Sequence, residues 1–109
     1  MEISNIDNQW RWDNWLRNNN QHNSFAQSWA WGDILIMEGK RVERLMVMEG
    51  EEVLAQAQVV YVPIIFGWQY GFCPQGPAFN GNKKAQESLF EYLKNKNCIF
   101  FRIEPVFAI

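Results

Sequence analysis

Histidine and cysteine are scarce in this 109-residue sequence, which contains one histidine, His22, and two cysteines, Cys73 and Cys98. His22 lies in an asparagine-rich stretch, and the two cysteines lie far apart in apolar segments. This spacing fits neither a metal site nor a disulfide framework. We therefore expect no metal, and we expect two buried free thiols of the kind found in a reducing compartment.

Signatures of nucleotide cofactors and of covalent catalysis are also missing. The sequence has no Walker loop, no GxGxxG and no nucleophile beside a base at a meaningful spacing. These absences predict a protein without a bound cofactor, and they leave the catalytic residues unassigned.

Long apolar runs and an excess of one charge are absent as well. No window approaches a membrane-spanning length without charged residues, and residues 1–15 lack the apolar core of a signal peptide. The net charge is −2 and the basic residues are scattered, which does not favour electrostatic capture of nucleic acid or of an anionic membrane. We expect a soluble cytoplasmic protein.

Apolar and aromatic residues, in contrast, are abundant, at 48% and 16% of the chain, and they include six tryptophans. These fractions are typical of a folded protein, and the length suffices for one domain with a modest core. Indole rings need deep packing or a ligand. Because Trp29 and Trp31 lie about 200° apart on a helix, we expect one of them to pack and the other to lie near the surface or a cleft.

Two helices are predicted in the N-terminal third of the chain. The first spans 8–17 and follows Asp7, which is a suitable N-cap. The second spans 24–38 and opens with Ser24-Phe-Ala-Gln27, which has the form of a capping box.

Four strands are predicted, at 41–48, 53–62, 66–73 and 98–104. Alternation within the second strand predicts one shared face made of Val53, Ala55, Ala57, Val59 and Tyr61. A third helix, 83–96, with an apolar stripe made of Ala85, Leu89 and Leu93, connects the last two strands. Such a crossover predicts that 98–104 runs parallel to 66–73, whereas the hairpin spacing predicts that the first three strands are antiparallel.

The element order is therefore ααβββαβ, which predicts an α+β fold with a mixed sheet flanked by helices. The last strand is apolar on both faces, yet only PVFAI follows its closing Glu104, so the far edge of the sheet is left open. We interpret residues 1–109 as a single N-terminal part of a longer protein, truncated after the last strand. The open edge also predicts self-association.

The turn Cys73-Pro-Gln-Gly-Pro77 joins a predicted strand to a predicted helix. Gly76 permits a close approach of the backbone to a ligand, and Pro77 fixes the turn. If the turn binds a ligand, we expect Gly76 to face an open crevice beside Tyr70 and Trp31. If the turn is purely architectural, we expect Gly76 to supply a positive φ.

Four stretches form a distinctive series along the chain: QSWAWG at 27–32, AQAQV at 55–59, Tyr70 with CPQGP at 73–77, and FFRIEP at 100–105. In this order they resemble the opening part of FemAB/FemX-type aminoacyltransferases. The resemblance covers nearly the whole chain from residue 24 onward. It implies a GNAT-like domain, that is, one with an acetyltransferase-like fold.

The resemblance also implies an enzyme of peptidoglycan biosynthesis. Members of the family move an amino acid from aminoacyl-tRNA onto the stem peptide of a peptidoglycan precursor, without coenzyme A. The acceptor is a UDP-muramyl-peptide or a lipid-linked precursor. The catalytic groups come largely from the second half of such proteins, so we expect this piece alone to be inactive.

Seven substrate-binding residues follow from the resemblance: Trp31, Tyr70, Gln75, Gly76, Asn80, Arg102 and Glu104. The family usually carries arginine at the position of Gln75 and often an acid at that of Asn80. Structural roles are alternatives for two of the seven. Tyr70 fits sheet packing, and Arg102 shares a strand face with Glu104, where an ion pair would stabilise a buried charge.

Two other interpretations stay open. A GNAT acyltransferase that uses acyl-CoA would need a glycine-rich pyrophosphate loop, whereas QGPA at 75–78 contains one glycine and a proline that removes a donor. A non-catalytic half that binds a partner through its open sheet edge is also consistent with the sequence.

Overall fold

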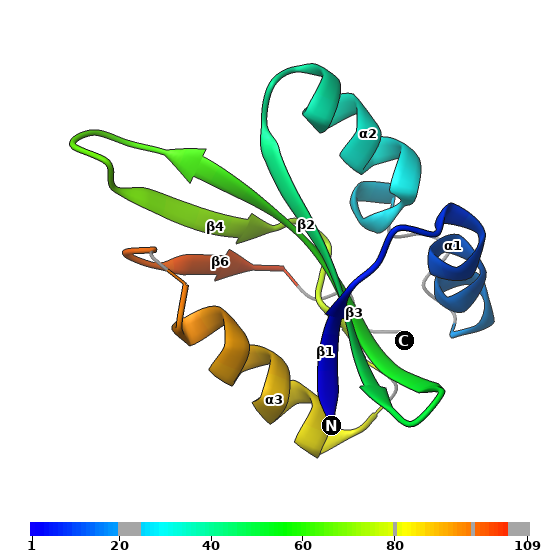
Figure 1. Ribbon diagram of the computed structural model, residues 1–109. Coiled ribbons are helices and arrows are strands. Elements are labelled where there is room, and N and C mark those ends of the chain that lie inside the picture. The colour runs from blue at the N-terminus through cyan, green and yellow to red at the C-terminus, as the bar shows by residue number, and fades with distance from the viewer. Residues whose placement is uncertain (20–24, 80, 97, 105–109) are drawn as a thin grey trace.

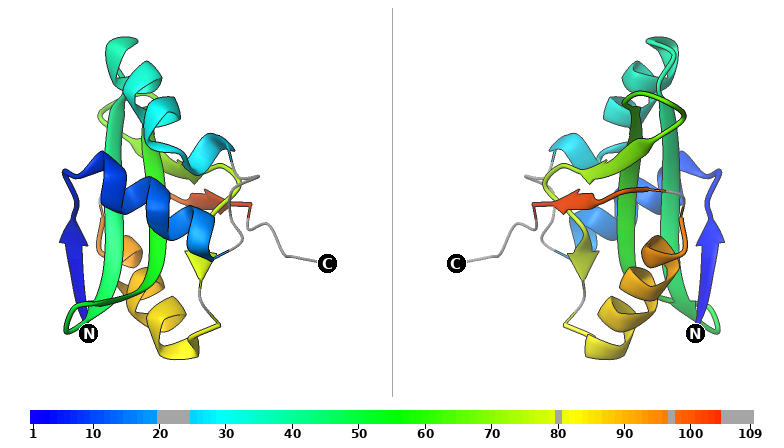
Figure 2. Two further views of the ribbon diagram at one scale, coloured as in Figure 1. Left: turned by 90° about the vertical axis from the view of Figure 1, so that its right-hand side faces the viewer. Right: turned by 90° about the vertical axis from the view of Figure 1, so that its left-hand side faces the viewer.

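A six-stranded sheet forms the centre of the molecule, with helices on both of its faces (Figures 1 and 2). The computed structural model describes residues 1–19, 25–79, 81–96 and 98–104. The elements are β1 (Glu2–Asn5), α1 (Gln9–Asn18), the 3₁₀ turn η1 (Phe25–Gln27), α2 (Trp29–Met37), β2 (Arg41–Glu49), β3 (Glu52–Pro63), β4 (Gln69–Cys73), β5 (Ala78–Phe79), α3 (Lys83–Lys94) and β6 (Phe101–Ile103). The strand order is β1-β2-β3-β4-β6, and β5 pairs separately with β3.

The strand directions agree with those predicted from the sequence. β3 is antiparallel to both β2 and β4. β6 runs parallel to β4, with Gly71 opposite Phe101 and Cys73 opposite Ile103. The parallel pair requires a crossover connection, and α3 provides it. The predicted topology of the four strands is thus confirmed.

Two short strands were missing from the predicted order ααβββαβ. β1 pairs with β2, so that Ile3 lies opposite Val47, and β5 pairs with β3 at Ala55 and Gln56. β1 has four residues and β5 has two, which is too short for an alternating pattern to be recognised in the sequence.

The predicted strands 66–73 and 98–104 begin later than expected. β4 starts at Gln69 because Phe66 and Gly67 adopt left-handed conformations, with φ of 58° and 78°, in a tight turn. β6 starts at Phe101, although the N–H of Ile99 already donates to the carbonyl of Gln69 (3.0 Å).

The predicted caps of the first two helices were also wrong. The side chain of Asn8, not of Asp7, caps α1 by accepting from the N–H of Arg11 (3.0 Å). Ser28 caps α2, since η1 separates the preceding residues from the helix. Of the predicted capping box, Ser24 lies outside the described residues, and the side chain of Gln27 is buried against the sheet. None of the helices in the described ranges is long and apolar enough to cross a membrane.

Two cores lie on opposite faces of the sheet. The predicted stripe of α3 packs against the predicted face of β3, and both are buried: Ala85, Leu89 and Leu93 with Ala55, Ala57, Val59 and Tyr61. On the other face α1 and α2 contribute Trp12, Leu16 and Trp29, which pack with Met46 and Ala78 of the sheet. The helices therefore cover both faces as predicted.

A β-bulge corrects the predicted face of one residue. Val47 lies opposite Ala55, but Met48 lies opposite Val53, so Leu54 is an extra residue in β3. The bulge turns Val53 to the α1 side of the sheet, away from Ala55, while Leu54 joins the core under α3.

A buried carboxylate fastens the end of α3 to the sheet. Glu43 of β2 accepts from the hydroxyls of Tyr61 and Tyr92 and from the ammonium of Lys96 (3.3 Å). Burial is the main cause that raises the pKa of Tyr61 far above its usual value, and the hydrogen bond to Glu43 adds to it. Tyr61 therefore stays neutral and acts as a donor.

The free edge of β6 predicts self-association of the 109-residue chain. No strand in the described part of the chain pairs with the outer edge of β6, where Ile103 is partly exposed. We expect sedimentation velocity to show association that increases with protein concentration. Ile103→Lys should weaken it, because a charge on an edge strand opposes pairing with another edge. A wild-type chain that stays monomeric at high concentration would contradict this prediction.

Candidate functional site

The sheet opens along one edge of β3, and a side chain fills the opening. On that edge β3 pairs with β5 at Ala55 and Gln56 and with β4 from Val60 onward. Between these pairs, the N–H of Gln58 donates to Oε1 of Gln27 (2.8 Å), and its carbonyl accepts from Nε2 of Gln27 (3.2 Å). The side-chain amide of Gln27 therefore substitutes for a strand residue, since it offers the same donor and acceptor as a peptide group.

The same amide holds the turn 74–77. Nε2 of Gln27 also donates to the carbonyl of Pro74 (2.7 Å), and Oε1 of Gln75 accepts from the N–H of Ala26 (2.8 Å). Two hydrogen bonds thus join the turn to η1. Gly76 is buried beside them, and its carbonyl accepts from the N–H of Glu104 at the end of β6 (2.9 Å).

The position of Gly76 contradicts both predictions made for it. A Cβ on Gly76 would lie 2.6 Å from Cδ of Gln27, so its Cα faces this side chain and not an open crevice. The residue with a positive φ in the turn is Gln75 (55°). Glycine is needed at position 76 because the protein's own amide packs against it.

Cys73 lies under the same turn and is fully buried. Burial raises the pKa of its thiol to about 12, although a contact with Nε2 of Gln27 (3.6 Å) opposes the rise. A neutral buried thiol is a poor nucleophile, so Cys73 contributes packing and not covalent chemistry.

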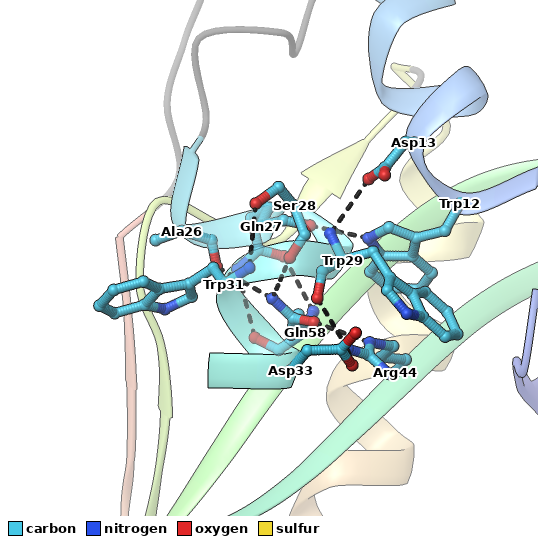
Figure 3. A network of polar contacts seen from close by, with 10 residues as sticks. All are labelled: Trp12, Asp13, Ala26, Gln27, Ser28, Trp29, Trp31, Asp33, Arg44 and Gln58. Carbon is cyan, nitrogen blue, oxygen red and sulfur yellow. Dashed lines mark hydrogen bonds and ion pairs between the residues drawn. The ribbon is translucent and has the colours of Figure 1, made fainter. Parts of the chain in front are cut away.

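A second glutamine and an arginine extend the network beneath α2 (Figure 3). Nε2 of Gln58 donates to the carbonyls of Ala26 (3.2 Å) and Ser28 (2.8 Å), and its Oε1 accepts from Nε of Arg44 (2.9 Å). Any side chain at Gly32 would overlap the amide oxygen of Gln58. Glycine at this position therefore lets α2 approach the sheet.

Hydrogen bonds, an ion pair and an aromatic ring fix the position of the Arg44 side chain. Its Nη2 donates to the carbonyl of Trp29 (2.8 Å) and to the carboxylate of Asp33 (2.9 Å), and its guanidinium lies 3.6 Å from the centre of the Trp29 ring. Such a buried cation is tolerated because it is paired and hydrogen-bonded.

Helix α1 is tied to the same group of residues. The indole N–H of Trp12 donates to the carbonyl of Gln27 (2.7 Å), and a carboxylate oxygen of Asp13 accepts from the N–H of Trp29 (3.0 Å). The hydrogen bonds of α1, η1, α2, β2, β3 and the turn therefore converge on a few polar side chains, and a shift of one element moves the others.

Sequence reasoning missed Gln27, Gln58 and Arg44 as organising residues. A signal was present: Gln58 lies at the centre of an apolar strand, where a polar side chain must find partners inside the protein. Its partner could not be identified, because Gln27 is 31 residues away in sequence.

Aromatic rings and a cation cover the sheet face formed by β4 and the segment leading into β6. The rings of Tyr70 and Phe100 are stacked, with centroids 4.8 Å apart and an interplanar angle of 8°. The guanidinium of Arg102 lies 5.3 Å from the centre of the Phe72 ring. Tyr70 therefore packs in the sheet, as its alternative role predicted, and it also borders a partly exposed ring.

The predicted pair of Arg102 and Glu104 forms, but it is not buried. Their charged atoms lie 3.1 Å apart, and their side chains are 66% and 41% exposed. The argument that a buried charge needs a partner does not apply here. Because a guanidinium has five N–H donors, Arg102 keeps donors for a further acceptor.

Trp29 and Trp31 differ in burial, as predicted. Trp29 is buried, whereas the indole of Trp31 is half-buried and points away from those of Trp12 and Trp29 (Figure 3). Trp31 packs on Phe25, with ring centroids 5.8 Å apart. Its Nε1 is buried and has no hydrogen-bond partner among the described residues.

The structure brings four of the predicted site residues together. Gln75 and Gly76 belong to the turn, and the carbonyl of Gly76 accepts from the N–H of Glu104 at the end of β6. Glu104 in turn pairs with Arg102. Tyr70 lies two residues before Phe72, which contacts Arg102. Trp31 lies beyond η1, which is bonded to Gln75. Asn80, the seventh predicted residue, lies outside the described residues, as does His22.

Comparisons with known proteins agree with this architecture. The model of the FemAB family matches residues 8–109, so the chain belongs to the FemAB family. A crystal structure of FemX is similar to the whole of this chain, with a TM-score of 0.78 and 21% sequence identity. No curated protein matches. The likeness to FemX confirms the predicted GNAT-like fold, and the chain spans 28% of the length of FemX.

We predict that Gln27→Glu destabilises the protein by about 2–4 kcal/mol, because a carboxylate cannot donate to the buried carbonyls of Gln58 and Pro74. Chemical unfolding measures the change. Gln9→Glu is the matched control: Gln9 is exposed at the first position of α1, where an acid is neutral or favourable. Equal effects of the two substitutions would show that the amide network contributes nothing specific.

The contact between Gly76 and Gln27 can be tested by a double-mutant cycle. Gly76→Ala should lower the free energy of unfolding by about 1–3 kcal/mol, since the new methyl group overlaps the amide. In a Gln27→Ala background the same change should cost clearly less, because the space is then empty. Additive effects in the cycle would contradict the proposed packing.

Proposed function

We propose that this chain is the N-terminal lobe of an aminoacyltransferase that moves an amino acid from aminoacyl-tRNA to the stem peptide of a peptidoglycan precursor. The observation that carries the proposal is membership of the FemAB family over residues 8–109. Because the chain spans 28% of FemX, we assign the activity to a longer protein that contains it and not to this piece alone. We place the reaction in the cytoplasm, where aminoacyl-tRNA is found.

The chemistry of this transfer asks mainly for orientation. The amino group of the stem peptide attacks the ester carbonyl of the aminoacyl-tRNA, an amide bond forms, and the ester C–O bond breaks. The ribose oxygen of the tRNA leaves and takes up the proton that the amine loses, so that it becomes a free hydroxyl. The acceptor amine is itself the nucleophile, so the protein needs to position both substrates and to polarise a carbonyl.

We assign the acceptor to the face of β4 and β6. A peptidoglycan precursor combines carboxylates and phosphates with sugar and peptide groups. Arg102 offers exposed donors that match a carboxylate or a phosphate. The stacked rings of Tyr70 and Phe100 offer a flat apolar surface beside it. Charged and apolar parts of one precursor molecule thus find complementary groups side by side.

The turn 74–77 supports this face without contacting the acceptor through Gly76. It is fixed by Gln27 from one side and by the N–H of Glu104 from the other. Gln75 already accepts from Ala26, so its oxygen is engaged within the protein. In this proposal Arg102, Tyr70 and Trp31 line the site, Glu104 remains a contact at its border, and Gln75 and Gly76 position the turn. Asn80, which lies outside the described residues, stays a predicted contact.

The alternative of an acyl-CoA-dependent enzyme has weaker support. A pyrophosphate loop presents several main-chain N–H groups to the phosphates. In this turn the N–H of Gly76 donates to the carbonyl of Cys73 (3.3 Å), and Pro77 has no N–H. The turn therefore has few donors left for a pyrophosphate.

We predict that Arg102→Gln lowers the affinity of the longer enzyme for UDP-muramyl-pentapeptide about tenfold or more, because charge-assisted hydrogen bonds are lost. Titration calorimetry measures this affinity. The melting temperature should change little, since an exposed ion pair contributes about 1 kcal/mol at most.

The matched control is Lys40→Gln, which breaks the exposed pair of Lys40 with Glu38 (3.0 Å) elsewhere on the surface. It should leave both the affinity and the melting temperature unchanged. If Arg102→Gln and Lys40→Gln bind the precursor equally well, the assignment of the acceptor to this face is wrong.

A further inference from the structure

The turn between β3 and β4 exposes an unusual amount of apolar surface. It projects from the body of the molecule (Figure 1) and carries four large side chains. These residues, which we call the apolar tip, are Ile64, Ile65, Phe66 and Trp68, with exposed fractions of 47%, 57%, 90% and 59%. Contiguous apolar patches on a protein surface mark sites of interaction with another protein or a membrane.

Phe66 is unfavourable for folding in two respects. It has a φ of 58° and is followed by Gly67 at 78°, in a turn closed by the N–H of Trp68 donating to the carbonyl of Ile65 (3.1 Å). Asparagine, aspartate and glycine are preferred in such a turn, whereas a bulky residue is strained there. The Phe66 side chain is 90% exposed, so burial does not offset this strain. Strain without a gain in packing indicates a role outside the fold.

The apolar surface continues from the tip to the segment before β6. Phe66, Gly67 and Trp68 line a pocket of about 270 Å³ together with Cys98 and Ile99. Ile99 is 46% exposed, and the neighbouring Phe100 is 50% exposed. The patch is therefore formed by two chain segments and not by the turn alone.

Cations lie next to this patch. Arg41 lies opposite Tyr61, near the end of β3 that leads into the turn. The N–H of Cys98, which lines the pocket, donates to the carbonyl of Lys96 (2.8 Å). The guanidinium of Arg41 lies 5.1 Å from the centre of the Tyr61 ring.

The net charge concerns the chain as a whole and not single cations near the tip. The chain as a whole has a net charge of −2, and its basic residues are scattered in sequence. Near the pocket lie Arg41, whose guanidinium contacts the Tyr61 ring, and Lys96, which pairs with Glu43 (3.3 Å). Two cations therefore lie beside the apolar tip.

We propose that the apolar tip inserts into the headgroup region of an anionic phospholipid bilayer, while Arg41 and Lys96 contact the headgroups. Apolar side chains on a projecting turn can enter the interface without moving the rest of the fold, and tryptophan favours this region. Basic residues within a Debye length of the surface add attraction to anionic lipids. This docking does not depend on the aminoacyl transfer.

A second copy of the chain is a less suitable occupant. In a symmetric dimer that joined two tips, the same patch would face itself. Arg41 and Lys96 of one copy would then approach those of the other, and like charges repel. An anionic bilayer matches both the apolar and the cationic part of the surface.

Flotation of the 109-residue chain with lipid vesicles tests the proposal. We expect binding to vesicles of equal parts phosphatidylglycerol and phosphatidylcholine, and weaker binding to vesicles of phosphatidylcholine alone. Raising the salt concentration should weaken the binding to the anionic vesicles, because screening removes the headgroup attraction.

Phe66→Asn separates docking from folding. Asparagine tolerates the left-handed conformation, so the melting temperature should stay the same or rise. The partition coefficient onto anionic vesicles should fall about tenfold, since a buried ring is lost from the interface. Trp10→Gln is the matched control, because Trp10 is a 74% exposed aromatic residue on α1. It should bind vesicles like the wild type.

Three results would overturn the proposal. The first is that the wild-type chain does not bind anionic vesicles. The second is that Phe66→Asn binds them as well as the wild type does. The third is that Trp10→Gln loses as much binding as Phe66→Asn. Sedimentation without lipid adds a further check. If the wild-type chain forms oligomers and Phe66→Asn is monomeric, the apolar tip is an interface between copies and does not bind a bilayer.

Discussion

The peptide-like amide of Gln27 is the interaction on which the rest of this structure depends. Where β4 and β5 part from each other along β3, Gln58 would be left with a buried donor and a buried acceptor, and each unsatisfied group costs about 1–3 kcal/mol. Gln27 satisfies both and binds Pro74 as well. The sheet can therefore open at this point, and the turn that leads away from it has a fixed position.

The two faces of the sheet are stabilised by different means. Under α3 the contacts are mainly between apolar side chains, with the hydrogen bonds of Glu43 at one end, and apolar packing accepts changes that conserve volume. Under α1 and α2, Arg44, Gln58 and the close approach at Gly32 form a network in which each group needs its partner. The candidate site lies beside the second face, so its geometry is set by directional bonds.

Periodicity predicted those parts of the fold that depend on one segment at a time. The stripe of α3 and the hairpin of β2 and β3 follow from local patterns. The parallel course of β6 follows from the helical crossover between two predicted strands. The role of Gln27 did not, because a glutamine three residues after a serine fits a capping box as well as a buried amide. The role of Gly76 was predicted wrongly because the group that approaches it, the amide of Gln27, comes from a distant part of the chain. The neighbours of Phe66, which include Cys98 and Ile99, depend on the three-dimensional arrangement and not on a local pattern.

The hydrogen bond from the N–H of Glu104 to the carbonyl of Gly76 has a kinetic consequence. It joins the last strand to a turn that already depends on Gln27, so it closes a long stretch of chain. Contacts between residues far apart in sequence form late, because loop closure costs entropy before it is rewarded. On the ribosome, the N-terminal helices and the hairpin of β2 and β3 emerge first. The carbonyl of Gly76 therefore remains exposed to water until residue 104 has left the exit tunnel.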